Sequence, residues 1–122
     1  MKATAKGVKR IINAFGYSFC GFKQTFKSEA AFRQDLAFCA VMLVVSFFFN
    51  VTVVEWLLMI GALFLIVLME LINTAIEAVV DRISPDYHEL SKKAKDIGSL
   101  LVLIAFVWTF IVWGCILLAK YM

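Results

Sequence analysis

The sequence predicts an all-α integral membrane protein in which an amphipathic surface helix precedes three transmembrane helices. Of the 122 residues, 63% are hydrophobic and the mean hydropathy is +0.91. A soluble domain of this size needs a far more polar surface. Charged residues make up 17% of the chain and gather in clusters between long apolar runs. We therefore expect one membrane domain over residues 1–122.

Residues 7–26 are predicted to form the surface helix. Their apolar side chains recur at helical spacing, and basic and polar side chains occupy the other faces, which is typical of a helix lying in the membrane interface. Gly16 and Gly21 are positions where this helix could bend or break. The first 28 residues carry six Lys or Arg and no acid, which favours an anionic membrane surface or phosphate ligands and argues against nucleic acid. The apolar positions are Val8, Ile11, Ile12, Phe15, Phe19, Phe22 and Phe26.

Three spans are predicted, at about 30–49, 53–80 and 97–119. The first has a short apolar run, so it reaches the length of a span only if the polar residues that begin at Glu29 lie at headgroup level. Glu29 and Arg33 are spaced to pair there. The second is longer than the hydrocarbon requires, so its last turns should emerge into water. The third is uncharged, with Trp108 and Trp113 available as interfacial anchors.

The distribution of Lys and Arg predicts the orientation. The connection near residues 50–55 has none, whereas residues 81–96 have four and the N-terminal segment has six. We therefore expect a multi-pass membrane protein whose N-terminus faces the cytoplasm and whose C-terminus lies on the outer side. Lys120, near the C-terminus, is a mild exception to this distribution. The three cysteines form no CxxC or metal-ligand spacing, so unpaired thiols are expected.

A polar stripe interrupts the second span. At about 100° per residue, its members fall on one narrow face of the helix. An ionisable group within a bilayer is costly and therefore indicates a functional site. The stripe consists of Glu70, Asn73, Thr74, Glu77 and Asp81.

Depth divides the stripe into two parts. Glu70 lies ~21 Å along the helix from Trp56, which puts it ~9 Å below the cytoplasmic boundary of a core ~30 Å thick. Glu77 lies ~10 Å further on and reaches that boundary. This arrangement suits one carboxylate that acts on a lipid headgroup and another that holds a water-borne ligand.

Glu29, Glu77 and Asp81 offer hard oxygen ligands near one level. Carboxylates together with substrate phosphates are how proteins usually hold Mg²⁺. The alternative is that Glu29 pairs with Arg33 and Glu77 belongs to a structural network. Glu70 is a candidate general base, and the alternative is interhelical hydrogen bonding with Asn73 and Thr74.

The loop over residues 81–96 is dense in polar groups. Ser84 before Pro85 predicts a helix N-cap followed by proline at the first helical position. No P-loop or GxGxxG motif is present, and His88 lacks the second histidine of a zinc helix. Lys95 and Asp96 are candidates for contact with a polyphosphate and a nucleotide base.

Three segments closely resemble the prokaryotic diacylglycerol kinase family. They are EAAFRQD at 29–35, MELINTAIEAVVDRI at 69–83 and YHELSKKAKDIGS at 87–99, and RIINAFGYS at 10–18 also matches. The resemblance implies a homotrimeric inner-membrane enzyme that transfers the γ-phosphate of MgATP to diacylglycerol, giving phosphatidic acid. Phe19-Cys20 and Pro85-Asp86 depart from the family pattern.

The resemblance also implies roles for individual residues. Glu70 corresponds to the catalytic base, and Glu29 and Glu77 to the Mg²⁺ ligands, with Asn73 and Asp81 in support. Nucleotide-binding positions are Arg10, Tyr17, Glu29, Glu77, Asp86, His88, Lys95 and Asp96. Lipid-binding positions are Arg10, Ser18, Gln34, Trp56, Glu70, Ser99 and Trp113.

Other functions remain as alternatives. Some family members phosphorylate undecaprenol, and the block from Glu29 to Gln34 resembles the diacylglycerol branch more closely. A small transporter using Glu70 is a different class, but transporter sites usually lie near the midplane between inverted repeats. The three spans show no internal repeat. A purely structural membrane subunit would not need Glu29, Glu70 and Glu77 together.

Overall fold

The computed structural model describes residues 6–122, and this part of the chain contains four α-helices and no strand. They are α1 (Val8–Ser28), α2 (Ala30–Ser46), α3 (Val53–Ile83) and α4 (Glu89–Tyr121). The predicted all-α class is therefore confirmed. Lys2, one of the six basic residues of the N-terminal segment, lies outside the described residues.

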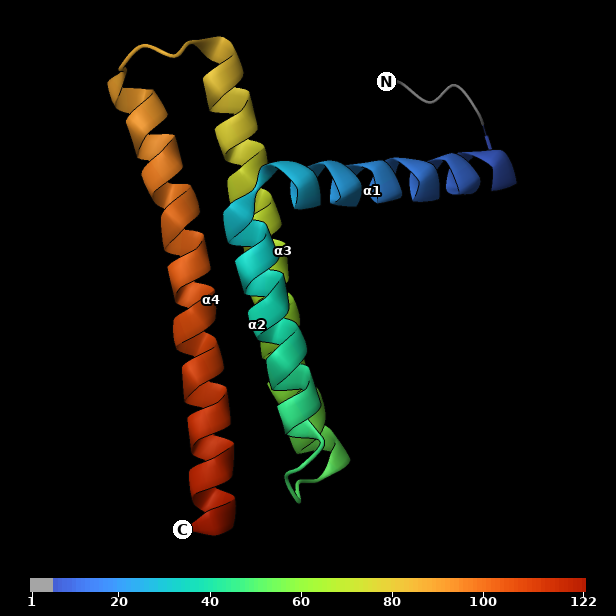
Figure 1. Cartoon of the computed structure of the whole chain (residues 1–122), viewed down its shortest axis with the longest axis vertical. Helices are drawn as coiled ribbons and strands as arrows, with labels where there is room; N and C mark the ends of the chain where they lie inside the picture. The colour runs from blue at the N-terminus through green and yellow to red at the C-terminus, as the bar shows by residue number, and fades with distance from the viewer. Residues whose placement is uncertain (1–5) are drawn as a thin grey trace.

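Helix α1 leaves the other three helices sideways and runs across the bundle axis (Figure 1). It is continuous through Gly16 and Gly21, so neither glycine breaks it. None of its residues is buried, and its apolar side chains face outward, as the 74% exposure of Phe15 illustrates. Only its C-terminal end meets the bundle, where the ring of Phe22 lies edge-on to that of Phe32 at 5.8 Å. A helix with an open apolar face suits the surface of a membrane.

The corner between α1 and α2 is held by Arg33. Its guanidinium Nη1 donates to the carbonyl oxygens of Phe26 at 2.6 Å and Lys27 at 3.0 Å. The predicted pairing of Arg33 with Glu29 was therefore wrong. The last carbonyls of a helix have no partners within the helix and carry partial negative charge, so they attract a guanidinium. Glu29 takes the extended conformation between the helices, and its carboxylate accepts a hydrogen bond from Ser28 at 3.3 Å.

Helices α2, α3 and α4 form the bundle, with α3 packed against both of the others. The core is apolar and sits mainly between α3 and α4. Two side chains of α4 bond to backbone carbonyls of α3: Thr109 Oγ1 lies 3.3 Å from Ala62 O, and Trp113 Nε1 donates to Met59 O at 3.1 Å. Trp113 is thus a core residue and not the interfacial anchor that we expected. The core cluster comprises Cys39, Met59, Leu63, Ile66, Ala105, Val112 and Trp113.

The end of the bundle that carries the α2–α3 connection is tied by polar contacts. Thr52 and Glu55 form a capping box at the start of α3, with bonds of 2.8 and 3.1 Å. Glu55 also pairs with Lys120 at 3.2 Å, and the Asn50 amide donates to the Tyr121 hydroxyl at 2.9 Å. Lys120 is the one basic residue at this end of the bundle among residues 6–122, and its partner there is Glu55. The T-x-x-E spacing at 52–55 is a sequence signal for this cap.

Helices α3 and α4 are long and apolar enough to cross a membrane. Helix α2 has 17 residues and is shorter, about 26 Å at 1.5 Å per residue. It ends at Ser46, before the predicted end of the first span at residue 49. Figure 1 shows α3 and α4 extending beyond the level at which α1 leaves the bundle, towards the loop that joins them.

That loop ends α3 and does not begin a helix at Pro85. Ser84 is the C-cap of α3 in an extended conformation, and its hydroxyl accepts a bond from the Asp86 amide at 3.0 Å. The predicted N-cap at Ser84 was wrong: no helix begins at Pro85, and the proline instead helps to end α3, because it disfavours helical geometry at the residue before it. His88 is the N-cap of α4 instead, and its Nδ1 accepts from the Leu90 amide at 3.0 Å. The last helix thus begins eight residues before the predicted span at 97.

Gly98 is required where α3 and α4 approach most closely in the polar region. A Cβ at this position would overlap the amide oxygen of Asn73. We expect Gly98→Ala to destabilise the folded protein by about 1–3 kcal/mol, because an extra group must displace a packed neighbour. Gly114→Ala on the same helix is the control, since a Cβ there meets nothing within 4 Å and alanine favours the helix by up to ~1 kcal/mol. Unfolding in detergent micelles measures both variants, and equal stability of the two would contradict the expectation.

Candidate active site

An acidic groove lies where α1, the α1–α2 corner and α3 meet. Its volume is about 490 Å³, and it is lined by Glu29 from the corner together with Thr74, Glu77 and Asp81 from α3. The C-terminal part of α1 forms the opposite wall through Gly21, Gln24, Thr25 and Ser28. The three carboxylates that the sequence places at one level therefore line one groove, although they do not form a tight cluster.

A second hollow of about 450 Å³ lies under the α3–α4 loop. Four predicted nucleotide-binding residues line it: Asp86, His88, Lys95 and Asp96. Asp81 lines both this loop pocket and the acidic groove, so the two are adjacent. A ligand that carries a polyphosphate and a base could therefore extend from one hollow into the other.

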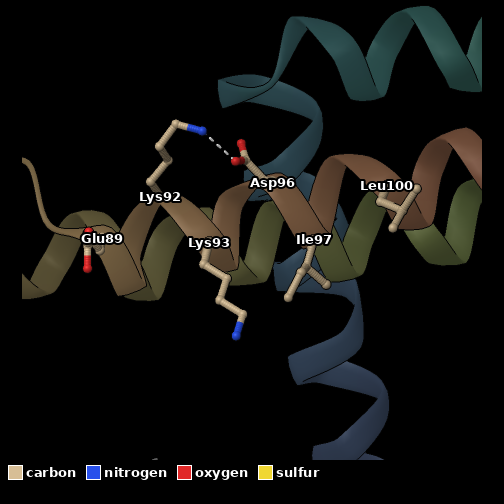
Figure 2. Close-up of a pocket in the computed structure, with 6 residues that line it drawn as sticks. All are labelled: Glu89, Lys92, Lys93, Asp96, Ile97 and Leu100. Atoms are coloured by element: carbon tan, nitrogen blue, oxygen red, sulfur yellow. Dashed lines mark hydrogen bonds and ion pairs between the residues drawn. The ribbon is translucent and has the colours of Figure 1, made fainter.

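Ion pairs occupy the charged groups of the loop pocket. Lys95 Nζ lies 2.7 Å from Asp81 Oδ1, and Lys92 Nζ lies 2.6 Å from Asp96 Oδ2. Figure 2 shows Lys92 and Asp96 pointing towards one another along α4, whereas Lys93 points away from them. These side chains are 43–64% exposed, and pairs of this kind contribute about 0–1 kcal/mol. An incoming polyanion could therefore replace the partner of either lysine at little cost.

Glu70 lies deeper on the same face of α3 and is buried, with 5% of its surface exposed. Seven residues separate it from Glu77, about 10 Å along the helix. Asp35 is half-buried on α2, one turn before Cys39, which contacts Leu63 of α3, and Asn73 lies one turn from Glu70 on α3 itself. A buried carboxyl between two helices and below an acidic groove can accept a proton from a group that approaches through the apolar region.

Two polar atoms beside Glu70 are buried and have no hydrogen-bond partner among the described residues: Asn73 Oδ1 and Thr74 Oγ1. We expected these side chains to be candidates for interhelical hydrogen bonding. Asn73 does contact α4, but it meets Gly98, which offers no polar side chain. Thr74 lines the acidic groove, where a buried unpaired oxygen favours a ligand that completes its bonding.

The remaining predicted residues do not join these hollows within one chain. Arg10, Tyr17 and Ser18 are exposed on α1, and the Ser18 hydroxyl bonds to Ala14 O of the same helix at 2.9 Å. Gln34 and Ser99 are exposed on α2 and α4. Trp56 lies near the start of α3, far from Glu70, where its Nε1 donates to Ser46 Oγ at 2.9 Å.

The acidic groove fits the chemistry of Mg²⁺ in complex with phosphates. Within residues 6–122 no group of three or more metal-binding side chains is clustered, so the chain offers no complete protein cage. Mg²⁺ is usually held by one or two carboxylates plus waters and substrate phosphates. Glu29 and Glu77 supply that number of hard oxygen ligands on one groove.

Comparison with known proteins decides the family. The family model described as prokaryotic diacylglycerol kinase matches residues 16–117. The chain belongs to the prokaryotic diacylglycerol kinase family. It is 44% identical over 118 residues to the diacylglycerol kinase of Escherichia coli K12, which covers 97% of this chain and 96% of that protein. The enzyme of the same name from Pseudomonas aeruginosa PAO1 is 46% identical, over 92% of this chain and 91% of its own.

A more distant relative carries the same name. The Helicobacter pylori 26695 diacylglycerol kinase is 40% identical over 97% of this chain and 92% of its own length. Near-complete coverage in these relatives means that the kinase family assignment applies to the whole domain. The protein is therefore an enzyme, a kinase, and its apolar helices and family indicate that it is associated with a membrane.

Sequence reasoning missed two residues of this region. Asp35 reads as a headgroup-level residue because it precedes the apolar run of the first span, but the structure half-buries it on the face of α2 that carries Cys39. Gly98 has no side chain to attract attention, and its importance appears only when Asn73 is placed against it. A small residue within a long helix next to a polar stripe is the available signal.

Proposed function

We propose that this protein phosphorylates the free hydroxyl of diacylglycerol with MgATP, giving phosphatidic acid and ADP. One observation carries the proposal: the acidic groove and the loop pocket are joined at Asp81, and Glu70 lies buried below them on the same helix face. A water-soluble phosphate donor and a membrane-bound acceptor would then meet along a single stripe of α3. The names of the relatives support the choice of substrate.

The nucleotide would lie across the two hollows. Glu29 and Glu77 would hold the metal of MgATP, which neutralises phosphate charge during transfer. Lys95 would leave Asp81 to contact the phosphates, and Asp86, His88 and Asp96 would face the nucleoside. Phosphoryl transfer depends mainly on positioning and charge stabilisation, which these side chains would supply.

Glu70 would act as the general base. The lipid hydroxyl reaches it from the apolar side, while the γ-phosphate arrives from the acidic groove above. As the hydroxyl oxygen bonds to the γ-phosphorus, its proton passes to Glu70, and the bond to the bridging oxygen breaks with its electron pair leaving on ADP. Burial favours this role because it keeps water, a competing acceptor, away from the carboxylate.

The proposed setting is the bacterial inner membrane, with α2, α3 and α4 all spanning it and α1 on the cytoplasmic surface. The distribution of Lys and Arg supports this orientation. A homotrimer would explain why Arg10, Tyr17 and Ser18 lie on a helix that projects from its own bundle, since a neighbouring chain could receive them. It would also cover apolar side chains that a single chain leaves exposed.

Purified protein in mixed micelles tests the proposed function. Phosphatidic acid and ADP should form in equal amounts when ATP, Mg²⁺ and diacylglycerol are all present, and neither should form when one is left out. Undecaprenol in place of diacylglycerol tests the other branch of the family. Steady ATP consumption without any lipid acceptor would contradict a lipid kinase.

Glu70→Gln should lose turnover while MgATP still binds. The substitution preserves the size of the side chain and removes its ability to accept a proton, which typically costs ~10²–10⁴ in rate. Initial rates at saturating lipid and ATP measure the loss, and a nucleotide-binding titration of the same preparation provides the control. Near-native turnover would remove Glu70 from the role of base.

Glu29→Gln and Glu77→Gln should each raise the Mg²⁺ concentration needed for half-maximal activity, or abolish activity. The reason is that Glu29 and Glu77 supply carboxylates on one groove, and losing either leaves a single ligand. Magnesium titrations at fixed ATP provide the measurement. Glu89→Gln at the exposed start of α4 is a matched control, and its half-saturation should equal that of the unmodified protein. Unchanged half-saturation in both groove variants would leave these residues with structural roles only.

Diacylglycerol should be preferred over undecaprenol. Both lipids present a hydroxyl, but only the glyceride has ester oxygens that polar groups near the interface, such as Ser18 and Ser99, can bind. An isoprenoid alcohol has no such oxygens, and the relatives named diacylglycerol kinase favour the glyceride, so kcat/KM for the glyceride should be the higher. The two lipids compete directly in one micelle preparation, and faster phosphorylation of undecaprenol would assign the protein to the other branch.

A further inference from the structure

We propose that Arg33 of α2 is a positioning residue for the candidate metal site: its guanidinium holds the α1–α2 corner at the angle that keeps the Glu29 carboxylate on the acidic groove. The inference rests on the proposed function, in which Glu29 and Glu77 hold the metal of MgATP. It gives a task to a basic side chain that lines neither the acidic groove nor the loop pocket.

The corner consists of a single residue. Glu29 is both the C-cap of α1 and the N-cap of α2, and its backbone is extended, with φ −114° and ψ 106°. Its amide donates to Thr25 O at 2.9 Å, and its carbonyl oxygen accepts from the Arg33 amide at 3.2 Å. Because no loop separates the two helices, the direction in which the Glu29 side chain leaves the backbone follows the angle between them.

Burial does little to fix that angle. Helix α1 leaves the bundle sideways (Figure 1), and none of its residues is buried. Besides the edge-on contact of the Phe22 and Phe32 rings, the corner is tied by the Arg33 guanidinium, whose Nη1 reaches Phe26 O at 2.6 Å and Lys27 O at 3.0 Å. These carbonyls belong to the last turn of α1 and lack partners within the helix. A charged donor makes short, strong bonds to them, so Arg33 fastens the first turn of α2 to the last turn of α1.

The same corner shapes the groove. The last two turns of α1 form one wall, and Glu77 lies on the α3 wall opposite. The Ser28 hydroxyl donates to Glu29 Oε2 at 3.3 Å, which keeps the Glu29 carboxylate beside the α1 wall. A change in the angle of α1 would therefore move both this wall and Glu29 relative to Glu77. Two carboxylates bind one Mg²⁺ only when both are within coordination distance of it, so the angle sets the affinity for the metal.

Arg33→Gln tests the inference in a measurement that needs no turnover. The new side chain is shorter and uncharged, so it cannot hold the two carbonyls. Mn²⁺ replaces Mg²⁺ in a complex with a nonhydrolysable ATP analogue, and the electron paramagnetic resonance spectrum of Mn²⁺ reports binding of this complex to the full-length protein in micelles. We expect its Kd to rise by about tenfold, the low end of what losing a group that orients a metal ligand usually costs.

Two comparisons separate the metal from the nucleotide and the corner from charge. Binding of the metal-free analogue in the presence of a chelator should be the same in Arg33→Gln and the unmodified protein, because Arg33 lines neither hollow. Arg82→Gln at the exposed C-terminal end of α3 is the matched control, since it removes the same charged group away from the corner. Its Kd for the Mn²⁺ complex should equal that of the unmodified protein. Arg33→Lys should recover part of the lost affinity, because an ammonium can still donate to a carbonyl of α1.

A double-mutant cycle separates positioning from a general structural effect. Arg33→Gln should cause no further loss of affinity for the Mn²⁺ complex in the Glu29→Gln protein, because the ligand that it positions is already absent. An equal loss in both backgrounds, an equal loss for the metal-free analogue, or an unchanged Kd in Arg33→Gln would each overturn the inference. If Arg33→Gln does not fold, Arg33→Lys provides the same cycle with a smaller expected loss.

The binding measurement also distinguishes this inference from the proposed function. If the unmodified protein phosphorylates diacylglycerol and Arg33→Gln binds the Mn²⁺ complex equally tightly, only the role of Arg33 is lost. If the unmodified protein makes no phosphatidic acid but Arg33→Gln still weakens binding of the Mn²⁺ complex, the proposed function fails and Arg33 keeps its role at the metal site.

Discussion

The free-energy cost of placing carboxylates within an apolar helix is the main constraint on how the helices of this protein pack. Helix α3 carries its polar stripe through a sequence that is otherwise suited to hydrocarbon, and an unsolvated ionisable group there is expensive. The neighbouring helices cover the stripe in two ways. Helices α2 and α4 both pack against α3 and leave Glu70 only 5% exposed, and α4 places Gly98 where a Cβ would overlap the amide oxygen of Asn73.

Covering the stripe also determines where ligands can enter. Beyond Thr74 the stripe is no longer enclosed by α2, because the chain turns away at Glu29 and continues as α1. The corner at Glu29 opens the acidic groove and adds a carboxylate to it. Arg33 maintains this corner by bonding to the last carbonyls of α1, which leaves the Glu29 carboxylate free to face the groove. The turn that ends the bundle on this side thus also completes the candidate metal site.

Much of this arrangement could be predicted from the sequence because it depends on local spacing. The 3.6-residue period placed Glu70, Glu77 and Asp81 on one face, and the acidic groove confirms that Glu77 and Asp81 open to a common hollow. Predictions at helix ends did less well. Ser84 was assigned to the wrong helix: its backbone amide bonds to Val80 O and ends α3, while its hydroxyl accepts a bond from the Asp86 amide. Arg33 was expected to face Glu29 but bonds to backbone carbonyls of α1 instead. How deeply Glu70 is buried depends on the antiparallel register of α3 with its neighbours, which no local pattern specifies.

The two ends of the bundle are held with different strength. At the α2–α3 end, a capping box, a half-buried ion pair and the Asn50–Tyr121 bond tie three helix termini together. At the α3–α4 loop, the two ion pairs, Lys92–Asp96 and Lys95–Asp81, are exposed and contribute little to stability. In the proposed function a polyanion enters the loop pocket, and the exposed Lys95–Asp81 pair would open for it at a cost of about 0–1 kcal/mol. The firmly tied end would keep α3 and α4 in register during that exchange, so the depth of Glu70 below the groove would stay fixed.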